Sequence, residues 1–521
     1  MAAAWMKDAI FYEIYPQSFF DTNGDGIGDI NGITEKLEYI QSLGCDALWL
    51  NPCFDSPFRD AGYDVRDYRK VASRYGTNDD LYRLFAEAHA RGMHVILDLV
   101  PGHTSEEHPW FQESRKAERN EFSDRYIWSN FCFQPCKGLN YVAGESERSG
   151  AYALNFFKCQ PALNYGFLLP REDWQFPTDH PAAIATREAM KDVMRFWLDH
   201  GCDGFRVDMA ASLVKFDDEE KSGTSAIWRD VRAMLDAEYP EAVLVAEWSQ
   251  PALAVGCGFD AAFCLNDPWT GYPSLMRDYD LLRLGTGSDN SYFRCGGDGD
   301  IRRFLEPYLR EYEATKRSGY ISLITCNHDT VRPSWNLSTL ELKLAYAFLF
   351  TMPGVPFLYY GDEIGMRYQP LPTKEGGYFR TGSRTPMQWN RGKNLGFSDG
   401  NAESLYLPVD PAPDAPTVEA QEADPDSLLN TVRALLSLRR EYAELRDNAN
   451  LEIIRTEKGD AFVYRRGRLT IAMNPTGASV SAPVDLRSSR LVFSIGAGRA
   501  EHEAIVMERQ SFLVLRSDAE V

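Results

Sequence analysis

The chain has 521 residues, 44% of them hydrophobic, which is enough for a large core and one or two attached domains. Its formal net charge of -21 disfavours binding to nucleic acid or to an anionic membrane surface, because both need basic patches. The simplest interpretation of the acidity is solubility.

The first 17 residues contain no charged leader followed by a long apolar segment, so we expect a folded domain and no signal peptide. The most apolar stretch, residues 345–361, is interrupted by two prolines and a glycine, which favours a helix and a core strand over a membrane span. The ten cysteines show no spacing typical of a zinc site. Without an export signal, we expect reduced, mostly buried thiols in a cytoplasmic protein.

Eight short apolar runs recur along the chain, and amphipathic helical patterns separate several of them. The runs begin at Ala9, Ala47, His94, Gly204, Ala242, Asp260, Tyr320 and Val355. This alternation of strands and helices predicts an α/β fold, a closed (β/α)8 TIM barrel. An open doubly wound sheet is the alternative, but no G-x-G-x-x-G motif follows the first run to support it.

The loop after the first run has the sequence "DTNGDGIGD" and is rich in oxygen ligands. Side-chain oxygens of Asp21, Asn23, Asp25 and Asp29, with the carbonyl of Ile27, could surround one hard cation. The spacing is similar to the start of an EF-hand loop, although the bidentate Glu at the end is missing. A glycine-rich turn without a metal explains the loop equally well at this point.

Two parts of the chain depart from the alternating pattern. Residues 104–160 are too many for one helix and are rich in Gly, Ser, Asn and aromatic residues, which predicts a subdomain inserted after the third strand. After about residue 443, short alternating runs predict an antiparallel C-terminal domain, a β-sandwich. We therefore expect the barrel in residues 1–103 and 161–443, subdomain B in 104–160, and the C-terminal domain in 444–521.

The fourth run carries two charged residues in an otherwise buried pattern. Side chains alternate along a strand, so Arg206 and Asp208 share one face while Phe205 and Val207 point the other way. In a barrel that face looks into the interior near the C-terminal mouth, where active sites form. We expect Arg206 to keep Asp208 ionised. A buried ion pair without chemistry is an equally good interpretation of this run alone.

Other predicted strands also carry polar residues at or near their ends. These residues are Asp98, His103, Glu247, Asn327, His328 and Asp329. Their convergence is typical of a catalytic constellation, and carboxylates with histidines, an arginine and no cofactor motif suit glycoside hydrolysis. Glu247 has no arginine beside it in the sequence, so we expect it to be the acid with the raised pKa.

Longer stretches carry a family resemblance that covers roughly residues 10–442. They are "FYEIYPQSFFDTNGDGIGDINGI", "DAGYDVRDY", "DLVPGHTSEEHPWF", "GFRVDMA", "AEW", "NHD", "YYGDEIGM" and "SRTPMQW". In these stretches the chain resembles the α-amylase family of retaining α-glycosidases, and within it the α-glucosidase and oligo-1,6-glucosidase branch. The C-terminal tail is similar to the β domain of that family.

The resemblance implies a role for each matching residue. Asp208 would be the nucleophile, Glu247 the acid/base and Asp329 the third carboxylate, which binds sugar hydroxyls. Asp60 and Arg380 would form an ion pair that closes the pocket behind the non-reducing sugar. Arg384 is interpreted as structural. The residues implied to bind the first sugar are Tyr63, His103, Gln160, Arg206 and His328.

The resemblance also favours a structural Ca²⁺, or Mg²⁺, in the loop of residues 21–29. Three positions depart from the family pattern. Gly102 stands where relatives usually have an Asn that in many amylases binds calcium, so that second site is doubtful here. Ala162 replaces an Asp that is usual in this branch. Met209 is neither the Val of α-1,6-preferring members nor the small residue of α-1,4-preferring ones, which leaves the linkage preference open.

These features predict an exo-acting retaining α-glucosidase that releases glucose from short α-1,4 or α-1,6 gluco-oligosaccharides. Its partner would be a small oligosaccharide, with no nucleic acid and no membrane. A glucosyl-transferring relative such as trehalose synthase shares every catalytic residue and stays an alternative, whereas the absence of the "RLDRD" segment disfavours sucrose isomerisation. A non-catalytic interaction protein of the same fold is disfavoured because all three carboxylates are present.

Overall fold

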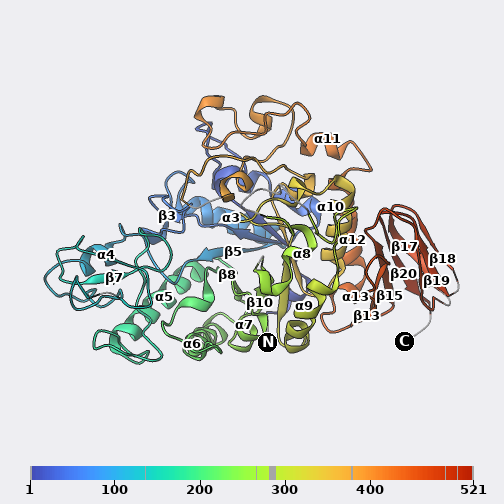
Figure 1. The fold of residues 1–521 in the computed structure, drawn as a ribbon. Helices are drawn as coiled ribbons and strands as arrows, with labels where there is room; N and C mark the ends of the chain where they lie inside the picture. The colour runs from blue at the N-terminus through green and yellow to red at the C-terminus, as the bar shows by residue number, and fades with distance from the viewer. Residues whose placement is uncertain are drawn as a thin grey trace.

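The chain is built around a closed barrel of eight parallel strands, near the centre of Figure 1. The computed structural model describes residues 3–134, 136–265, 267–280, 289–376, 379–486, 489–501 and 503–518. Around the barrel the strands are β1 (Phe11–Ile14), β2 (Ala47–Leu50), β5 (His94–Leu99), β8 (Gly204–Val207), β9 (Val243–Ala246), β10 (Ala261–Phe263), β11 (Tyr320–Ile324) and β12 (Val355–Tyr359), which pairs with β1. They coincide with the eight predicted runs, and the predicted TIM barrel is confirmed.

Helices cover the outside of the barrel. They are α1 (Ile30–Glu35), α2 (Leu37–Leu43), α3 (Asn78–Ala90), α5 (Pro181–Asp199), α6 (Ser222–Glu238), α7 (Pro251–Gly256), α8 (Pro273–Met276), α9 (Arg302–Thr315), α10 (Thr339–Thr351), α11 (Val418–Glu422), α12 (Leu428–Glu441) and α13 (Ala443–Arg446). Capping residues in the sequence determine where several of these helices begin. A capping box of Thr77 and Asp80 begins α3, and one of Ser338 and Glu341 begins α10.

The inside of the barrel changes from apolar to charged along the strands. Inside the barrel the ring of Phe357, from the middle of β12, packs on those of Phe11 and Phe263, with centroids 4.3 and 4.9 Å away. Further along, Glu13 and Arg206 are buried on the same inner surface. Buried charges are costly unless they are paired, so this layer must be held by ion pairs and hydrogen bonds.

A long insertion lies between β5 and α5, on the left of Figure 1. It contains α4 (Pro109–Ser114) and a two-stranded sheet of β6 (Tyr141–Ala143) and β7 (Ala151–Ala153). Its small apolar core includes Ile127, Phe167 and Trp174. A short hairpin, β3 (Phe54–Asp55) with β4 (Asp67–Val71), lies after β2. From β4, Tyr68 donates a hydrogen bond to the carbonyl of His103 and so ties this hairpin to the loop after β5.

Two antiparallel sheets form a separate C-terminal domain on the right of Figure 1. Their strands are β13 (Leu451–Arg455), β14 (Phe462–Arg466), β15 (Leu469–Asn474), β20 (Ser511–Ser517) and β17 (Ser489–Ile495) in one sheet, and β16 (Val480–Pro483), β19 (Ala504–Met507) and β18 (Gly498–Ala500) in the other. Arg466 joins this domain to the barrel, because its buried guanidinium donates to the carbonyls of Thr351 and Asp447.

The helix and strand expected in residues 345–361 are the end of α10 and all of β12, which confirms this interpretation of the most apolar stretch. Within the described residues, no helix has the length and apolar character needed to cross a membrane. All ten cysteines are free thiols, and all but Cys132 and Cys295 are buried.

Candidate active site

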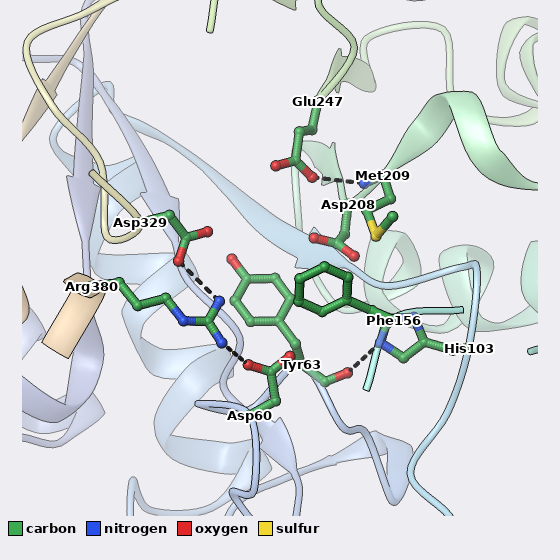
Figure 2. Close-up of a pocket in the computed structure, with 9 residues that line it drawn as sticks. All are labelled: Asp60, Tyr63, His103, Phe156, Asp208, Met209, Glu247, Asp329 and Arg380. Atoms are coloured by element: carbon green, nitrogen blue, oxygen red, sulfur yellow. Dashed lines mark hydrogen bonds and ion pairs between the residues drawn. The ribbon is translucent and has the colours of Figure 1, made fainter. Parts of the chain in front are cut away.

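A cavity of about 270 Å³ opens at the carboxyl ends of the barrel strands (Figure 2). Its lining comes from loops that follow β2, β5, β8, β9, β11 and β12, so residues far apart in the sequence meet at one mouth. The lining residues are Asp60, Tyr63, His103, Phe156, Asp208, Met209, Glu247, Asp329 and Arg380. The remaining predicted residues, Gln160, Arg206 and His328, are buried behind this wall and contact it.

Arg206 links three carboxylates beneath the cavity. Its Nη1 lies 2.8 Å from Asp98 Oδ1 and 3.2 Å from Asp208 Oδ1, and its Nη2 lies 3.1 Å from Glu247 Oε1. The register of β5 and β8 pairs Asp98 with Arg206, and β9 is the next strand. Arg206 is 1% exposed, so these contacts must offset the desolvation of a guanidinium and its partners.

The structure adds a partner to one of the predicted catalytic carboxylates and corrects an expectation about the other. Glu247 has no arginine beside it in the sequence, but the adjacent strands β8 and β9 bring it to Arg206. Arg206 also does not keep Asp208 ionised on its own. Burial and the negative charge of Glu247 raise the pKa of Asp208 well above its usual range, against the pull of Arg206.

Met209 fixes the position of Glu247 through its backbone. It adopts the left-handed conformation with φ of 44°, which is rare for a residue with a side chain and costs about 1–2 kcal/mol. In this turn its N–H donates a 2.7 Å hydrogen bond to Glu247 Oε2 (Figure 2). The Met209 side chain lines the cavity beside Asp208.

Three cationic groups surround Asp329. Arg384 Nη2 lies 2.7 Å and Arg380 Nη1 3.2 Å from Asp329 Oδ1, while His328 Nε2 lies 3.1 Å from Oδ2. Partial loss of water opposes ionisation, but His328, Arg380 and Arg384 hold the pKa of Asp329 well below its usual range. Arg384, interpreted from the sequence as structural, is buried and contacts this carboxylate directly.

His328 is charged because it lies between two carboxylates. Its Nδ1 is 2.9 Å from Glu13 Oε1, and its Nε2 also lies 2.6 Å from the hydroxyl of Tyr63. Burial favours the neutral ring, but Asp329 and Glu13 outweigh it and raise the pKa of His328 to about 9. Sequence reasoning missed Glu13, although a charge inside the first apolar run was a signal of the same kind as Arg206 in the fourth.

Asp60 and Arg380 form an ion pair at one end of the cavity (Figure 2). Arg380, from the short helix η8 (Phe379–Ser383), contacts Asp60 through Nη2 and Asp329 through Nη1. Gln160 Nε2 donates to the other Asp60 oxygen at 2.6 Å. Only 3% of Asp60 and 7% of Arg380 is exposed, so the pair is shielded from water and held from both sides.

Both ring nitrogens of His103 are used within the protein. Lys215 donates to Asn155 Oδ1 at 3.0 Å, which turns the Asn155 amide nitrogen toward His103 Nδ1 at 3.1 Å. The proton of His103 therefore sits on Nε2, which donates to the carbonyl of Tyr63 at 3.1 Å. Burial lowers the pKa of His103 to about 3, so the ring is neutral.

A Cβ at Gly102 would lie 2.7 Å from the side-chain amide nitrogen of Asn155, which explains a glycine at position 102.

The loop of residues 21–29 uses its polar side chains to hold its own backbone. Asp21 accepts hydrogen bonds from the N–H groups of Gly24 and Gly26, and Asp29 accepts from those of Thr22 and Gly32. Among the described residues, no group of three or more Asp, Glu, His or Cys gathers to hold a metal. Carboxylate oxygens can accept further bonds, so the cation at this loop stays a prediction.

Comparison with known proteins places the chain in a family. The family model for the alpha amylase catalytic domain matches residues 13–448, so the chain belongs to the α-amylase family of glycoside hydrolases. It is 36% identical over 487 residues, 84% of this chain and 76% of the relative, to trehalose synthase/amylase TreS of Mycolicibacterium smegmatis. It is 31% identical over 542 residues, 92% of this chain and 93% of the relative, to an oligo-1,6-glucosidase of Heyndrickxia coagulans.

A solved structure shares the same fold. The trehalulose synthase MutB from Pseudomonas mesoacidophila MX-45 superposes with a TM-score of 0.80, at 24% sequence identity, over 99% of this chain and all of that one. Identity at this level supports the fold alone.

Proposed function

We propose that the protein is an exo-acting retaining α-glucosidase that takes single glucose units from short α-gluco-oligosaccharides. The observation that carries the proposal is the buried Asp60–Arg380 pair, which closes one end of the cavity beside Asp329. A closed end accepts a terminal sugar and excludes the middle of a chain. The cavity of about 270 Å³ is small for a binding site, as expected for one sugar unit. The oligo-1,6-glucosidase relatives support the same class of substrate.

The chemistry follows the double-displacement pattern. Asp208 attacks the anomeric carbon, the glycosidic C–O bond breaks, and Glu247 gives its proton to the departing oxygen. Water then attacks the glycosyl ester, returns a proton to Glu247 and frees Asp208. For this step Asp208 must be ionised and Glu247 must carry the proton. Arg206 contacts both carboxylates and the Met209 N–H donates to Glu247 Oε2, so these groups hold the pair in position for the attack.

Asp329 has the role of a fixed anion beside the reacting sugar. His328, Arg380 and Arg384 keep it ionised and oriented, so it is ready to accept hydrogen bonds from two sugar hydroxyls. Positive charge develops on the sugar ring in the transition state, and a preorganised anion stabilises that charge more than the ground state.

Glucosyl transfer is the second candidate. The relative from Mycolicibacterium smegmatis carries the name trehalose synthase/amylase and is 36% identical to this chain. Hydrolysis and transfer share every residue named above and differ in whether water or a retained sugar attacks the glycosyl-enzyme.

Product analysis on maltose separates the two candidates. Hydrolysis gives two glucose molecules per maltose, the first released as the α-anomer, which proton NMR detects before mutarotation. Trehalose as the main product would show that the enzyme transfers glucosyl units, and glucosyl transfer would then replace hydrolysis as the proposed function. No conversion of maltose, isomaltose, sucrose or trehalose would contradict both.

We also propose a cytoplasmic location. Ten free thiols, eight of them buried, suit a reducing compartment, because cysteines paired in disulfides are typical of oxidising ones. Detection of the native protein in a secreted or periplasmic fraction would contradict this location.

A further inference from the structure

A second cavity, of about 360 Å³, lies away from the active site between the insertion and the barrel. Its walls come from β4, from the start of α4, from Arg125 and from α5. The cavity is larger than the active-site cavity and shares none of its lining residues. In a chain with a net charge of -21, its lining carries three arginines, Arg66, Arg69 and Arg125, against two carboxylates, Asp67 and Asp192, and Asp192 is paired with Arg195.

Arg125 brings an uncompensated positive charge to this cavity. Its guanidinium lies 4.9 Å from the ring of Trp110 and forms no ion pair or hydrogen bond with any described residue. Its Nη1 is enclosed by protein and has no hydrogen-bond partner. Burial lowers the pKa of Arg125. Enclosed charged donors are normally paired, so the unpaired guanidinium of Arg125 indicates that an acceptor is missing from the site.

Two further donors line the same cavity. The guanidinium of Arg69 lies 5.8 Å from the Phe196 ring and has no carboxylate partner among the described residues. His108 Nδ1 accepts the N–H of Trp110, so the ring proton sits on Nε2, for which the described residues offer no acceptor. Arg66, by contrast, is committed to Asp55 and Glu107.

We propose that this cavity binds a small anion of the phosphate type, either free or as the end group of a phosphorylated small molecule. Arg125, Arg69 and His108 supply donors from three separate segments, which suits the tetrahedral oxygens of a phosphate better than a planar carboxylate. Trp110 and Val193 form an apolar wall that can cover the organic part of such a ligand. The anion would cross-link the insertion, through Arg125, to the barrel, through Arg69.

Calorimetric titration with inorganic phosphate, at constant ionic strength, tests the proposal. We expect one phosphate per chain, a melting temperature that rises with phosphate concentration, and binding at least tenfold weaker in Arg125→Gln. Arg171→Gln is the matched control, because the exposed Arg171 also stacks on an aromatic ring, Phe216 at 4.8 Å, but lies outside the cavity. Arg69→Gln, at an exposed position, should also weaken binding and does not depend on refolding of the enclosed site.

The source of the anion is settled by a second titration with glucose 6-phosphate. Tighter binding than inorganic phosphate indicates a phosphorylated small molecule, and equal binding indicates the free anion. The proposal is overturned if the wild-type protein binds neither, if Arg125→Gln binds phosphate as well as the wild type does, or if acetate competes as strongly as phosphate.

Discussion

Asp208 and Glu247 both contact Arg206, and the proposed double displacement needs Asp208 ionised and Glu247 protonated. Asp208→Asn removes the attacking carboxylate while keeping its shape, so we expect kcat to fall by at least a thousandfold. Asp192→Asn, on the surface helix α5, is the matched control and should keep full activity. Circular dichroism and kcat measured on both variants check this. A tenth of the wild-type kcat in a pure, folded Asp208→Asn preparation would rule out the nucleophile assignment.

Glu247→Gln keeps the hydrogen bond from the Met209 N–H but cannot donate a proton to a leaving group. We expect it to fail on maltose and to retain much more activity on an activated aryl glucoside, whose leaving group needs little protonation. The ratio of kcat/KM on the two substrates is the readout. An equal loss on both would show that Glu247 is not the acid.

His328 predicts a pH dependence of stability. Its pKa is raised to about 9 from a usual 6.5, so its contribution to stability is fully present below about pH 6.5 and is lost as pH rises through about 9. Asp329, with a lowered pKa, contributes above its usual pKa and loses that contribution in acid. We expect the wild-type melting temperature to fall between pH 6.5 and 9 more steeply than that of His328→Gln. Parallel curves would contradict a charged His328.

At the scale of elements, the sequence was sufficient for the strands and insufficient for the contacts between them. The apolar runs predicted all eight barrel strands, because strands buried on both faces are continuous in hydrophobicity. They could not show that Arg206 reaches Glu247, since the strand neighbours that bring them together are 41 residues apart. Phe156 was missed for a related reason, because long loops carry no periodic signal that predicts the position of a side chain in the fold.

The loop of residues 21–29 is the element on which the predicted cation depends. A cation bound only by the folded protein would raise stability by mass action, so a chelator should lower the melting temperature and Ca²⁺ should restore it. Asp25→Ala is the sharper variant, since Asp25 is largely exposed and, among the described residues, accepts a hydrogen bond only from the N–H of Ile27. If metal content and melting are the same with and without chelator, in wild type and in Asp25→Ala, the loop is only a turn.

At the scale of the whole molecule, the barrel supplies a rigid floor of paired charges and the long loops supply the wall. Asp60 comes from the loop after β2 and Arg380 from the loop after β12, two strands that both flank β1. Their ion pair closes the mouth at one end, with Gln160 from the insertion holding Asp60 in place. We therefore propose that three loops, which meet only in the folded chain, limit the length of the substrate.

The most direct test of exo action is the time course of products from maltoheptaose labelled at its reducing end. The closed cavity predicts that glucose is released first and that the labelled product is shorter by one unit at each step, while starch is a poor substrate. Asp60→Ala should lower kcat/KM on disaccharides, because the terminal glucose loses its wall. Early release of maltose or longer oligomers by the wild-type enzyme would mean an open cleft, and would contradict the account.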